Sequence, residues 1–508
     1  MAGSNLKISA MMAYATIFAQ LLYNLAVTPI IIRVFGQSEY GVYSLCASVI
    51  TYLSLFQFGF GVTYLRYFIR FQQKGEEQKT EELNGMFLEV FISIAVIVAI
   101  LGAVLVSSSE VVLGEKLTAV EHRTAKLLLS LMVFNISLSM IGVMFVSAIN
   151  AHEHFVFQKG IALADNLLKP IVLIPLLLLG YKSFALVLLT TLFSIATVSI
   201  NVLYCLKKLN LRFRFSNFDF ALFKEMGVFS FFIFLQGVMD IFNWQIDKFL
   251  LTRFWGSAET AVYSVGAQFN AVFIALAAAV TGFFVPKVNQ LVASNSGDEV
   301  ISNLVIKLGR LQFIICTFLF SSFVFFGKPF VQFFAGNGYE NAYYVAILLI
   351  SPLIIPLSMD LCYHIARAKA LHKTSTTVFA FAALLNVLIS IPLCKKYGEI
   401  GAAFGTLIGM FIANNIFQYL YSEHIVGIDM KRWSKNIISM LPALIFPVVV
   451  GVLIMLFVNT YNIGVFIGMA FGYASVFAVS MWLYGLNNEE REMFSKLVKN
   501  IMWRLKRV

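Results

Sequence analysis

Residues 33–44 read Arg33-Val-Phe-Gly36-Gln-Ser-Glu39-Tyr-Gly-Val42-Tyr43-Ser44, and residues 253–264 repeat them as Arg253-Phe-Trp-Gly256-Ser-Ala-Glu259-Thr-Ala-Val262-Tyr263-Ser264. The two segments align without a gap at an offset of 220 positions, the difference between 253 and 33, and six of the twelve positions are identical. Each copy follows one long apolar run and precedes another. This spacing indicates that the chain contains two copies of one unit.

The composition places that unit in a membrane. The 508 residues are 60% hydrophobic and 12% charged, whereas a soluble chain has about 45–50% apolar and about 25% charged residues. A hydrocarbon core of about 30 Å needs about 20 apolar residues per helix, and such runs recur along the chain. The sequence therefore predicts an all-α polytopic membrane protein with about 14 transmembrane helices.

The predicted spans form two sets of six and a final pair. The first set is 8–32, 42–65, 86–106, 126–149, 160–179 and 183–206. The second set is 226–245, 259–284, 305–326, 342–365, 375–393 and 401–422, and the pair is 436–457 and 463–484. Because each set holds an even number of helices, both copies enter the membrane in the same direction, which predicts two parallel six-helix lobes.

The repeat also predicts the domain boundaries. An N-lobe of helices 1–6 occupies 1–225, a C-lobe of helices 7–12 occupies 226–435, and helices 13–14 occupy 436–485. The remaining residues, 486–508, mix basic and apolar residues near helical spacing, which is typical of an amphipathic helix on the membrane surface. We therefore expect a basic amphipathic cytoplasmic tail.

The basic residues predict the orientation. Alternate loops, counted from the N-terminus, carry about 26 of the 37 Lys and Arg residues, and the opposite loops carry about 10. By the positive-inside rule both termini are cytoplasmic, and we expect a multi-pass protein of the cell inner (plasma) membrane. The formal charge of +11 then belongs to loops beside an anionic leaflet rather than to a nucleic-acid site.

Several segments carry a family resemblance. They are the two motif copies with Asp247-Lys248 ahead of the second, Gly59-Phe-Gly61 leading to Arg66-Tyr67, and Tyr397-Gly398-Glu-Ile-Gly401-Ala-Ala. With these residues the chain resembles the polysaccharide (O-antigen or capsule) flippases of the multidrug, oligosaccharidyl-lipid and polysaccharide exporter superfamily. The resemblance implies a MATE-like fold whose two lobes surround a central V-shaped cavity that opens alternately inward and outward.

The same resemblance implies a function. Its implied cargo is a polyprenyl-pyrophosphate-linked oligosaccharide, moved from the cytoplasmic to the outer leaflet for cell-surface polysaccharide biosynthesis. The implied partners are this lipid-linked sugar and the membrane lipids, with other polysaccharide-assembly proteins left open and no nucleic acid. The sequence holds no phosphate-binding G-x-x-x-x-G-K-[ST] loop, and an inside-negative potential favours export of an anionic head by about 2.3 kcal/mol per charge per 100 mV.

We therefore expect a transporter and not an enzyme, without a cofactor or a metal. A coupling ion, H⁺ or Na⁺, is left open.

Two alternative functions remain. A cation-coupled multidrug exporter of the same fold should have an apolar or acidic cavity, whereas a flippase should have a cationic one. A membrane-embedded glycosyltransferase or polymerase should have a large extramembrane loop with clustered acids, and the longest predicted loops, near 107–124 and 207–225, are short.

Ionisable residues inside apolar spans are candidates for substrate binding, because each costs roughly 2.5–3.5 kcal/mol at mid-bilayer. Asp165 and Lys169 lie four residues apart in the fifth span, on one helical face. Either they form an ion pair that stabilises the lobe, or Lys169 meets a phosphate while Asp165 tunes it. In the seventh span, Gln236, Asp240 and Asn243 form a polar stripe that suits a cavity wall or a hydrogen bond to a neighbouring helix.

The tenth span carries a second polar face. Asp360, His364 and Arg367 fall at i, i+4 and i+7. Asp360 and His364 could relay protons, and Arg367 could receive a phosphate or extend to the interface.

Further candidates lie at helix ends and at prolines. Arg33 and Arg253 are symmetry mates at predicted outer helix ends, where they either interact with the helix C-terminus or bind pyrophosphate. Arg66, at the cytoplasmic end of the second span, is a third cationic candidate. Predicted bending points for gating, with a static kink as the alternative, are Pro29, Pro352 and Pro356.

Overall fold

The computed structural model describes residues 2–215, 219–282, 284–294, 297–369, 371–492 and 495–496. Within these ranges every regular element is helical. Ten helices are long and apolar enough to cross a membrane, or up to twelve if each of two bent helix pairs is one span. The prediction of an all-α polytopic membrane protein is confirmed, and the number of fourteen spans remains a prediction.

The chain forms two compact units. The first contains residues 1–264 and 387–405, and the second contains residues 265–386 and 406–508. The predicted division into lobes at residues 225 and 226 was drawn from the repeat rather than from contacts, and it remains a prediction. Most of the predicted tail, residues 493–494 and 497–508, lies outside the described residues.

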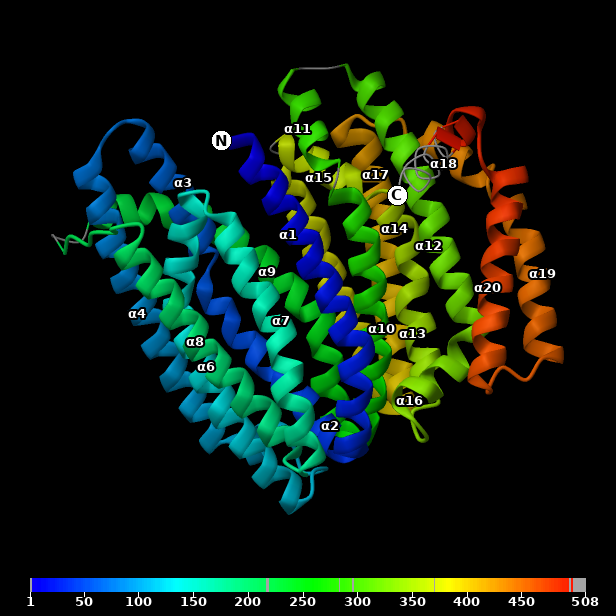
Figure 1. The fold of residues 1–508 in the computed structure, drawn as a ribbon, viewed down its shortest axis with the longest axis horizontal. Helices are drawn as coiled ribbons and strands as arrows, with labels where there is room; N and C mark the ends of the chain where they lie inside the picture. The colour runs from blue at the N-terminus through cyan, green and yellow to red at the C-terminus, as the bar shows by residue number, and fades with distance from the viewer. Residues whose placement is uncertain are drawn as a thin grey trace, which may run out of the picture. The chain divides into compact units, whose positions relative to one another are not determined.

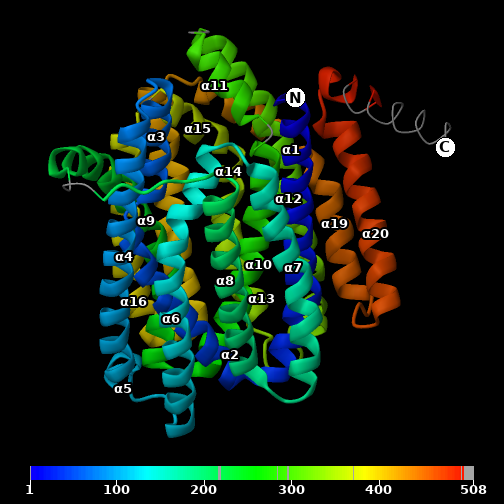
Figure 2. The same ribbon diagram turned by 60° about the vertical axis from the view of Figure 1, so that its left-hand side comes forward.

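Ten helices begin in the first unit, and the last of them continues into the second. They are α1 (Ala2–Leu22), α2 (Thr28–Leu53), α3 (Phe60–Gln73), α4 (Glu77–Ser107), α5 (Ser109–Leu113), α6 (Ala119–Ala151), α7 (Phe155–Leu178), α8 (Lys182–Lys207), α9 (Phe220–Phe254) and α10 (Ser257–Gly282). Figures 1 and 2 show α4, α6 and α8 running side by side.

The remaining helices belong to the second unit, except that residues 387–405 of α16 belong to the first. They are α11 (Val285–Ala293), α12 (Asp298–Ala335), α13 (Ala342–Ile350), α14 (Ile354–Ser358), α15 (Asp360–Ala368), α16 (His372–Met410), α17 (Gln418–Tyr421), α18 (Met430–Ile438), α19 (Pro442–Phe457) and α20 (Ile463–Ser480).

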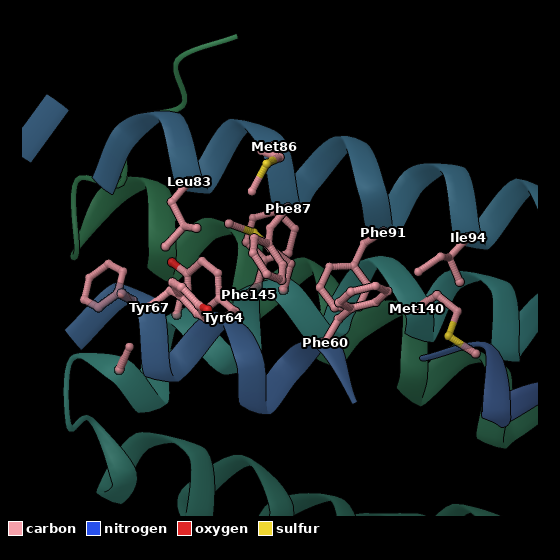
Figure 3. Close-up of a cluster of buried hydrophobic side chains, with 14 of the residues drawn as sticks. Phe60, Tyr64, Tyr67, Leu83, Met86, Phe87, Phe91, Ile94, Met140 and Phe145 are labelled. Carbon is pink, nitrogen blue, oxygen red and sulfur yellow. The ribbon is translucent and has the colours of Figure 1, made fainter. Parts of the chain in front are cut away.

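The core of the first unit is aromatic at one end. Figure 3 shows Phe60 and Tyr64 of α3 against Phe87 and Phe91 of α4, and all four side chains are buried. The rings of Tyr64 and Phe87 meet edge to face at 5.3 Å, and the Tyr64 hydroxyl donates to Asn84 Oδ1 at 2.7 Å. Lipid tails are as apolar as these side chains, so close packing and such hydrogen bonds, rather than hydrophobic burial, hold the helices together.

In the second unit α19 and α20 pack against α12. Phe325 and Phe326 of α12 contact Tyr473 of α20 with ring centroids 5.6 and 5.7 Å apart. A Cβ at Gly451 of α19 would lie 2.3 Å from the Phe325 ring, so α19 can approach this closely only because position 451 has no side chain. The predicted helices 13 and 14 are therefore docked on the same unit as α12.

The predicted bending points coincide with irregular backbone. A π-helical turn, Tyr23–Val27, ends just before Pro29, which lies in the first turn of α2. Pro352 lies in a short 3₁₀ segment, and the stretch from Ala342 to Ser358 that contains both prolines is bent by 51° against α15. The backbone is therefore irregular next to Pro29 and at Pro352, the 51° bend lies between Ser358 and Asp360, and a role of these prolines in gating remains a prediction.

Candidate functional site

The two motif copies form matching turns. Gly36 interrupts α2 with φ 74° and ψ 176°, and Gly256, between α9 and α10, has φ 106°. Residues with a side chain rarely adopt such angles, so the shared glycine is explained by the turn that each copy makes. Glu259 lies in the first turn of α10, as expected from the helix dipole.

Glu39 of the first copy contacts the start of another helix. Its carboxylate accepts hydrogen bonds from the backbone N–H of Ser183 at 2.9 Å and from the Ser183 hydroxyl at 2.5 Å, and it pairs with Lys182 at 3.4 Å. Glu39 therefore satisfies the start of α8 in addition to lying near the start of its own helical segment.

Polar side chains of α9 form one continuous face. Gln236, Asp240, Asn243 and Asp247 are spaced at i, i+4, i+7 and i+11, so they lie on the same side of the helix. Asp240 is exposed and Gln236 is half-buried, whereas Asn243 is 8% exposed and Asp247 is fully buried. Burial of the face therefore increases toward the C-terminal end of α9.

Tyr263 forms a hydrogen bond at the buried end of this face. Its hydroxyl donates to Asp247 Oδ2 at 2.5 Å. Asp247 belongs to the segment that carried the family resemblance, but it was not among the predicted site residues. The signal was available, because 247 continues the helical spacing of 236, 240 and 243.

The structure contains the ion pair expected on α7. Lys169 Nζ lies 2.6 Å from Asp165 Oδ2, and the two side chains are 22% and 26% exposed. Lys169 Nζ also lies 5.7 Å from the centre of the Phe193 ring. The second carboxylate oxygen, Asp165 Oδ1, is buried and accepts no hydrogen bond from the described residues. The pair is present, therefore, but its polar groups are not all satisfied.

The face predicted in the tenth span lies on α15. Asp360 Oδ2 and His364 Nε2 are 3.9 Å apart, with 27% and 28% of their side chains exposed. The Arg367 guanidinium is exposed and lies 5.3 Å from the centre of the Tyr363 ring.

The arginines predicted at helix ends are exposed. Arg253 lies in the last turn of α9, and Arg33 lies three residues before the Gly36 turn. The Arg66 guanidinium lies 4.6 Å from the centre of the Phe229 ring, where α3 meets α9. One turn further along α3, Arg70 pairs with Glu225 at 3.3 Å. Arg66 thus lies in a contact between two helices of the first unit.

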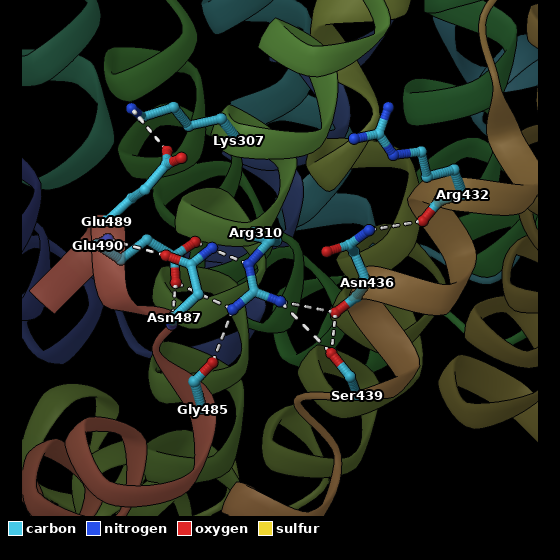
Figure 4. A network of polar contacts seen from close by, with 9 residues as sticks. All are labelled: Lys307, Arg310, Arg432, Asn436, Ser439, Gly485, Asn487, Glu489 and Glu490. Carbon is cyan, nitrogen blue, oxygen red and sulfur yellow. Dashed lines mark hydrogen bonds and ion pairs between the residues drawn. The ribbon is translucent and has the colours of Figure 1, made fainter.

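Sequence reasoning also missed the buried ion pair of Arg310 with Glu490. Arg310 of α12 makes a two-pronged ion pair with Glu490, at 2.7 Å from Nε to Oε1 and 2.9 Å from Nη2 to Oε2. It also donates to the carbonyl oxygens of Asn436 at 2.9 Å and Gly485 at 2.7 Å. Figure 4 shows how this network joins α12 to the C-terminal end of α18 and to the segment after α20. Arg310 falls in the predicted ninth span, so the rule for intramembrane charges could have identified it.

Nothing in the described part of the chain suggests a metal centre. No group of three or more His, Cys, Asp or Glu side chains among those residues is arranged to hold a metal ion. The cysteines, Cys46, Cys205, Cys316, Cys362 and Cys394, are all buried and unbridged, as expected for small core residues.

Comparison with known proteins confirms the resemblance. The family described as polysaccharide biosynthesis protein matches residues 6–292, more than half of the chain. EpsK, an uncharacterized membrane protein of Bacillus subtilis (strain 168), is 20% identical over 478 residues, covering 92% of this chain and 93% of EpsK.

Solved structures share the fold. The lipid II flippase MurJ, in an inward closed conformation, matches with a TM-score of 0.71 and 16% identity over 94% of this chain and 98% of MurJ. An inward-facing multidrug resistance MATE family transporter of the MOP superfamily matches with a TM-score of 0.63 and 15% identity, over 81% of this chain and 96% of that chain. The predicted MATE-like fold is therefore confirmed.

The two matched structures are those of a flippase and a transporter. The helices of this chain and its relatives together make it a multi-pass membrane protein. The chain belongs to the polysaccharide biosynthesis protein family.

Proposed function

We propose that this protein flips a polyprenyl-pyrophosphate-linked oligosaccharide from the cytoplasmic to the outer leaflet, by alternating access, for cell-surface polysaccharide biosynthesis. In the same proposal it lies in the inner membrane with both termini in the cytoplasm. The sugar hydroxyls and phosphates cannot cross hydrocarbon unaided, because each unpaired polar group would lose hydration worth several kcal/mol. A polar path through the protein removes this barrier while the polyprenyl chain stays in lipid.

The observation that carries the proposal is the unsatisfied ion pair on α7. Lys169 supplies a cation for a phosphate, and the unpaired Asp165 Oδ1 supplies an acceptor for a sugar hydroxyl. Buried carboxylate oxygens are usually hydrogen-bonded, so an oxygen left without a donor in the described residues suits an arriving ligand. Both members of the pair lie on α7, so the pair does not by itself join two helices.

The polar face of α9 supports the same proposal. Asp240 is exposed within an apolar helix, and a carboxylate facing lipid would cost roughly 2.5–3.5 kcal/mol at mid-bilayer. We therefore infer that Asp240, with the half-buried Gln236 one turn before it, faces water along the transport path. Arg367 and Arg66, both exposed, are proposed as cations for the pyrophosphate near the cytoplasmic ends of their helices.

The proposal is tested in liposomes that contain the purified protein and a fluorescent polyprenyl-pyrophosphate-linked sugar. Transport is measured as the fraction of label that becomes accessible to an impermeant quencher. We expect Lys169→Ala and Arg367→Ala to reduce the initial rate by at least about tenfold, since hydrogen bonds to charged groups contribute about 1.5–3 kcal/mol. Lys208→Ala, at the exposed end of α8, is the matched control with the same loss of charge.

A double variant separates the two roles of the α7 pair. Asp165→Leu combined with Lys169→Met replaces the pair by apolar side chains, which often keeps or raises stability. If Lys169 binds phosphate, this variant has a normal amount of folded protein and slow transport. Normal transport by this variant and by Arg367→Ala would show that the cationic site is assigned wrongly.

The acidic end of the α9 face supports a second candidate, a cation-coupled drug exporter. Asp240 and Asp247 are carboxylates on one helical face, and acidic groups in an apolar helix can bind a proton or a lipophilic cation. The same liposomes, given a pH gradient and a fluorescent lipophilic cation, test this function. Uptake that is lost in Asp240→Asn, with no movement of the lipid-linked sugar, would favour it over the flippase.

A further inference from the structure

A pocket of about 610 Å³ lies in the second unit, where α11, α12, α18 and the segment after α20 meet. Its lining contains four cationic side chains and two acidic ones, namely Lys287, Lys307, Arg310, Arg432, Glu489 and Glu490. Its lining residues belong neither to the two copies of the twelve-residue motif nor to the proposed transport path. Its charges are arranged in two layers, a buried base and an exposed mouth.

The base is electrically neutral. Arg310 and Glu490 are 5% and 6% exposed and paired through two hydrogen bonds. The remaining Arg310 donors face the carbonyl oxygens of Asn436 and Gly485 and the Ser439 hydroxyl. Because every polar group of the guanidinium has a partner, Arg310 shapes the pocket but does not recruit a ligand.

The mouth is positive. Lys287 and Arg432 are exposed, and their side chains make no ion pair with the described residues. Lys307 lies 3.7 Å from Glu489, but these side chains are 51% and 81% exposed. Exposed pairs of this kind contribute at most about 1 kcal/mol, so Lys307 can exchange its partner. The mouth of the pocket therefore carries three cationic side chains, Lys287, Lys307 and Arg432, and one acidic side chain, Glu489.

Apolar surface adjoins these cations. Leu291, Val300, Leu304 and Ile306 also line the pocket. Ile438, at the end of α18, and Leu441, just before α19, are 61% and 47% exposed. A ligand with both a phosphate and hydrocarbon chains matches this combination, and basic pockets between transmembrane helices are known to hold anionic lipid headgroups.

We propose that this pocket binds the phosphate of an anionic glycerophospholipid, with Lys287, Lys307 and Arg432 around the phosphate and the acyl chains along the exposed apolar residues. The inference does not depend on the cargo proposed above. It gives the docking of α19 and α20 on α12 a dependence on the lipid composition of the leaflet.

Native mass spectrometry of the delipidated full-length protein tests the proposal. Phosphatidylglycerol and phosphatidylcholine with identical acyl chains are titrated separately, and we expect tighter binding of phosphatidylglycerol that weakens as salt is added. Lys287→Gln and Arg432→Gln should each weaken phosphatidylglycerol binding about fivefold, and the double variant about 25-fold. Lys435→Gln, on the same short helix but outside the pocket lining, should leave binding unchanged.

Glu489→Gln gives a result of opposite sign. Removing the acid that competes for Lys307 should tighten phosphatidylglycerol binding about fivefold, which no loss of folding could imitate. Equal binding of the two lipids to the wild type would overturn the proposal, as would unchanged binding by the double variant. Displacement of phosphatidylglycerol by millimolar inorganic phosphate alone would also overturn it, since the pocket would then be a site for free phosphate.

Discussion

The two copies of the twelve-residue motif share a backbone turn but not their polar contacts. Gly36 and Gly256 have positive φ at equivalent positions, yet Glu39 binds the start of α8 while Glu259 lies at the start of its own helix. The copies also lie against each other, because a Cβ at Gly41 would lie 1.9 Å from the carbonyl oxygen of Ser257. Repetition has therefore preserved the turn and left the side-chain contacts free to diverge.

Substitution of Gly41, where the two motif copies approach most closely, should reduce stability more than the other substitutions below. We expect Gly41→Ala to destabilise the protein by about 3 kcal/mol, the upper part of the range for overpacking, because the obstructing atom is backbone. The midpoint of thermal unfolding in detergent and the amount of protein in membranes measure this effect. Gly227→Ala on α9 is the control, since its Cβ would meet nothing within 4 Å.

Ala261, the equivalent residue in the second copy, already has a methyl group and is fully buried. Ala261→Gly should therefore have a much smaller effect than Gly41→Ala. If Gly41→Ala unfolds at the wild-type temperature, the contact between the two copies is looser than described.

The two turn glycines come next in expected effect. Gly36→Ala and Gly256→Ala should each cost about 1–3 kcal/mol, since they force a side chain onto backbone that favours glycine. Steric obstruction is not the cause, because a Cβ at Gly36 meets nothing within 4 Å and one at Gly256 meets only the carbonyl oxygen of Lys116 at 3.7 Å. The midpoint of thermal unfolding of both variants measures this cost. Gly282→Ala is the control, because Gly282 has an ordinary φ and a Cβ added there would meet nothing within 4 Å that could obstruct a methyl group. Similar losses would support equivalent turns, and a loss at only one position would contradict them.

The smallest expected difference lies between the two motif glutamates. Glu39→Gln should cost about 1 kcal/mol, because it weakens the charge-assisted bonds to Ser183 and the pair with Lys182. Glu259→Gln should cost about 0.3–0.5 kcal/mol, since it removes only an interaction with the helix dipole. A double-mutant cycle of Glu39→Gln with Ser183→Ala in thermal unfolding isolates the first effect. Equal costs for the two glutamates would show that the contact with α8 adds nothing.

The sequence predicted what depends on local pattern. Apolar runs predicted the helices, and i, i+4 spacing placed Asp165 beside Lys169. Contacts between distant residues were not predictable in this way. The Arg310–Glu490 pair joins positions 180 apart, and the partner of Glu39 lies 144 residues away. Periodicity describes one helix at a time, so it cannot choose among distant partners.

The carboxylate of Glu121 contacts both motif copies, which are synthesised at different times. Glu121, in the capping box that begins α6, accepts hydrogen bonds from Ser38 of the first copy at 2.6 Å and from Ser257 of the second. Synthesis proceeds at about 5–20 residues per second, so the 136 residues between Glu121 and Ser257 take roughly 7–27 s to add. The donor from the first copy, Ser38, therefore precedes Glu121 in the order of synthesis, and the donor from the second copy follows it by this interval. The complete set of hydrogen bonds to Glu121 requires α10, so a chain that ends before α10 lacks one of them.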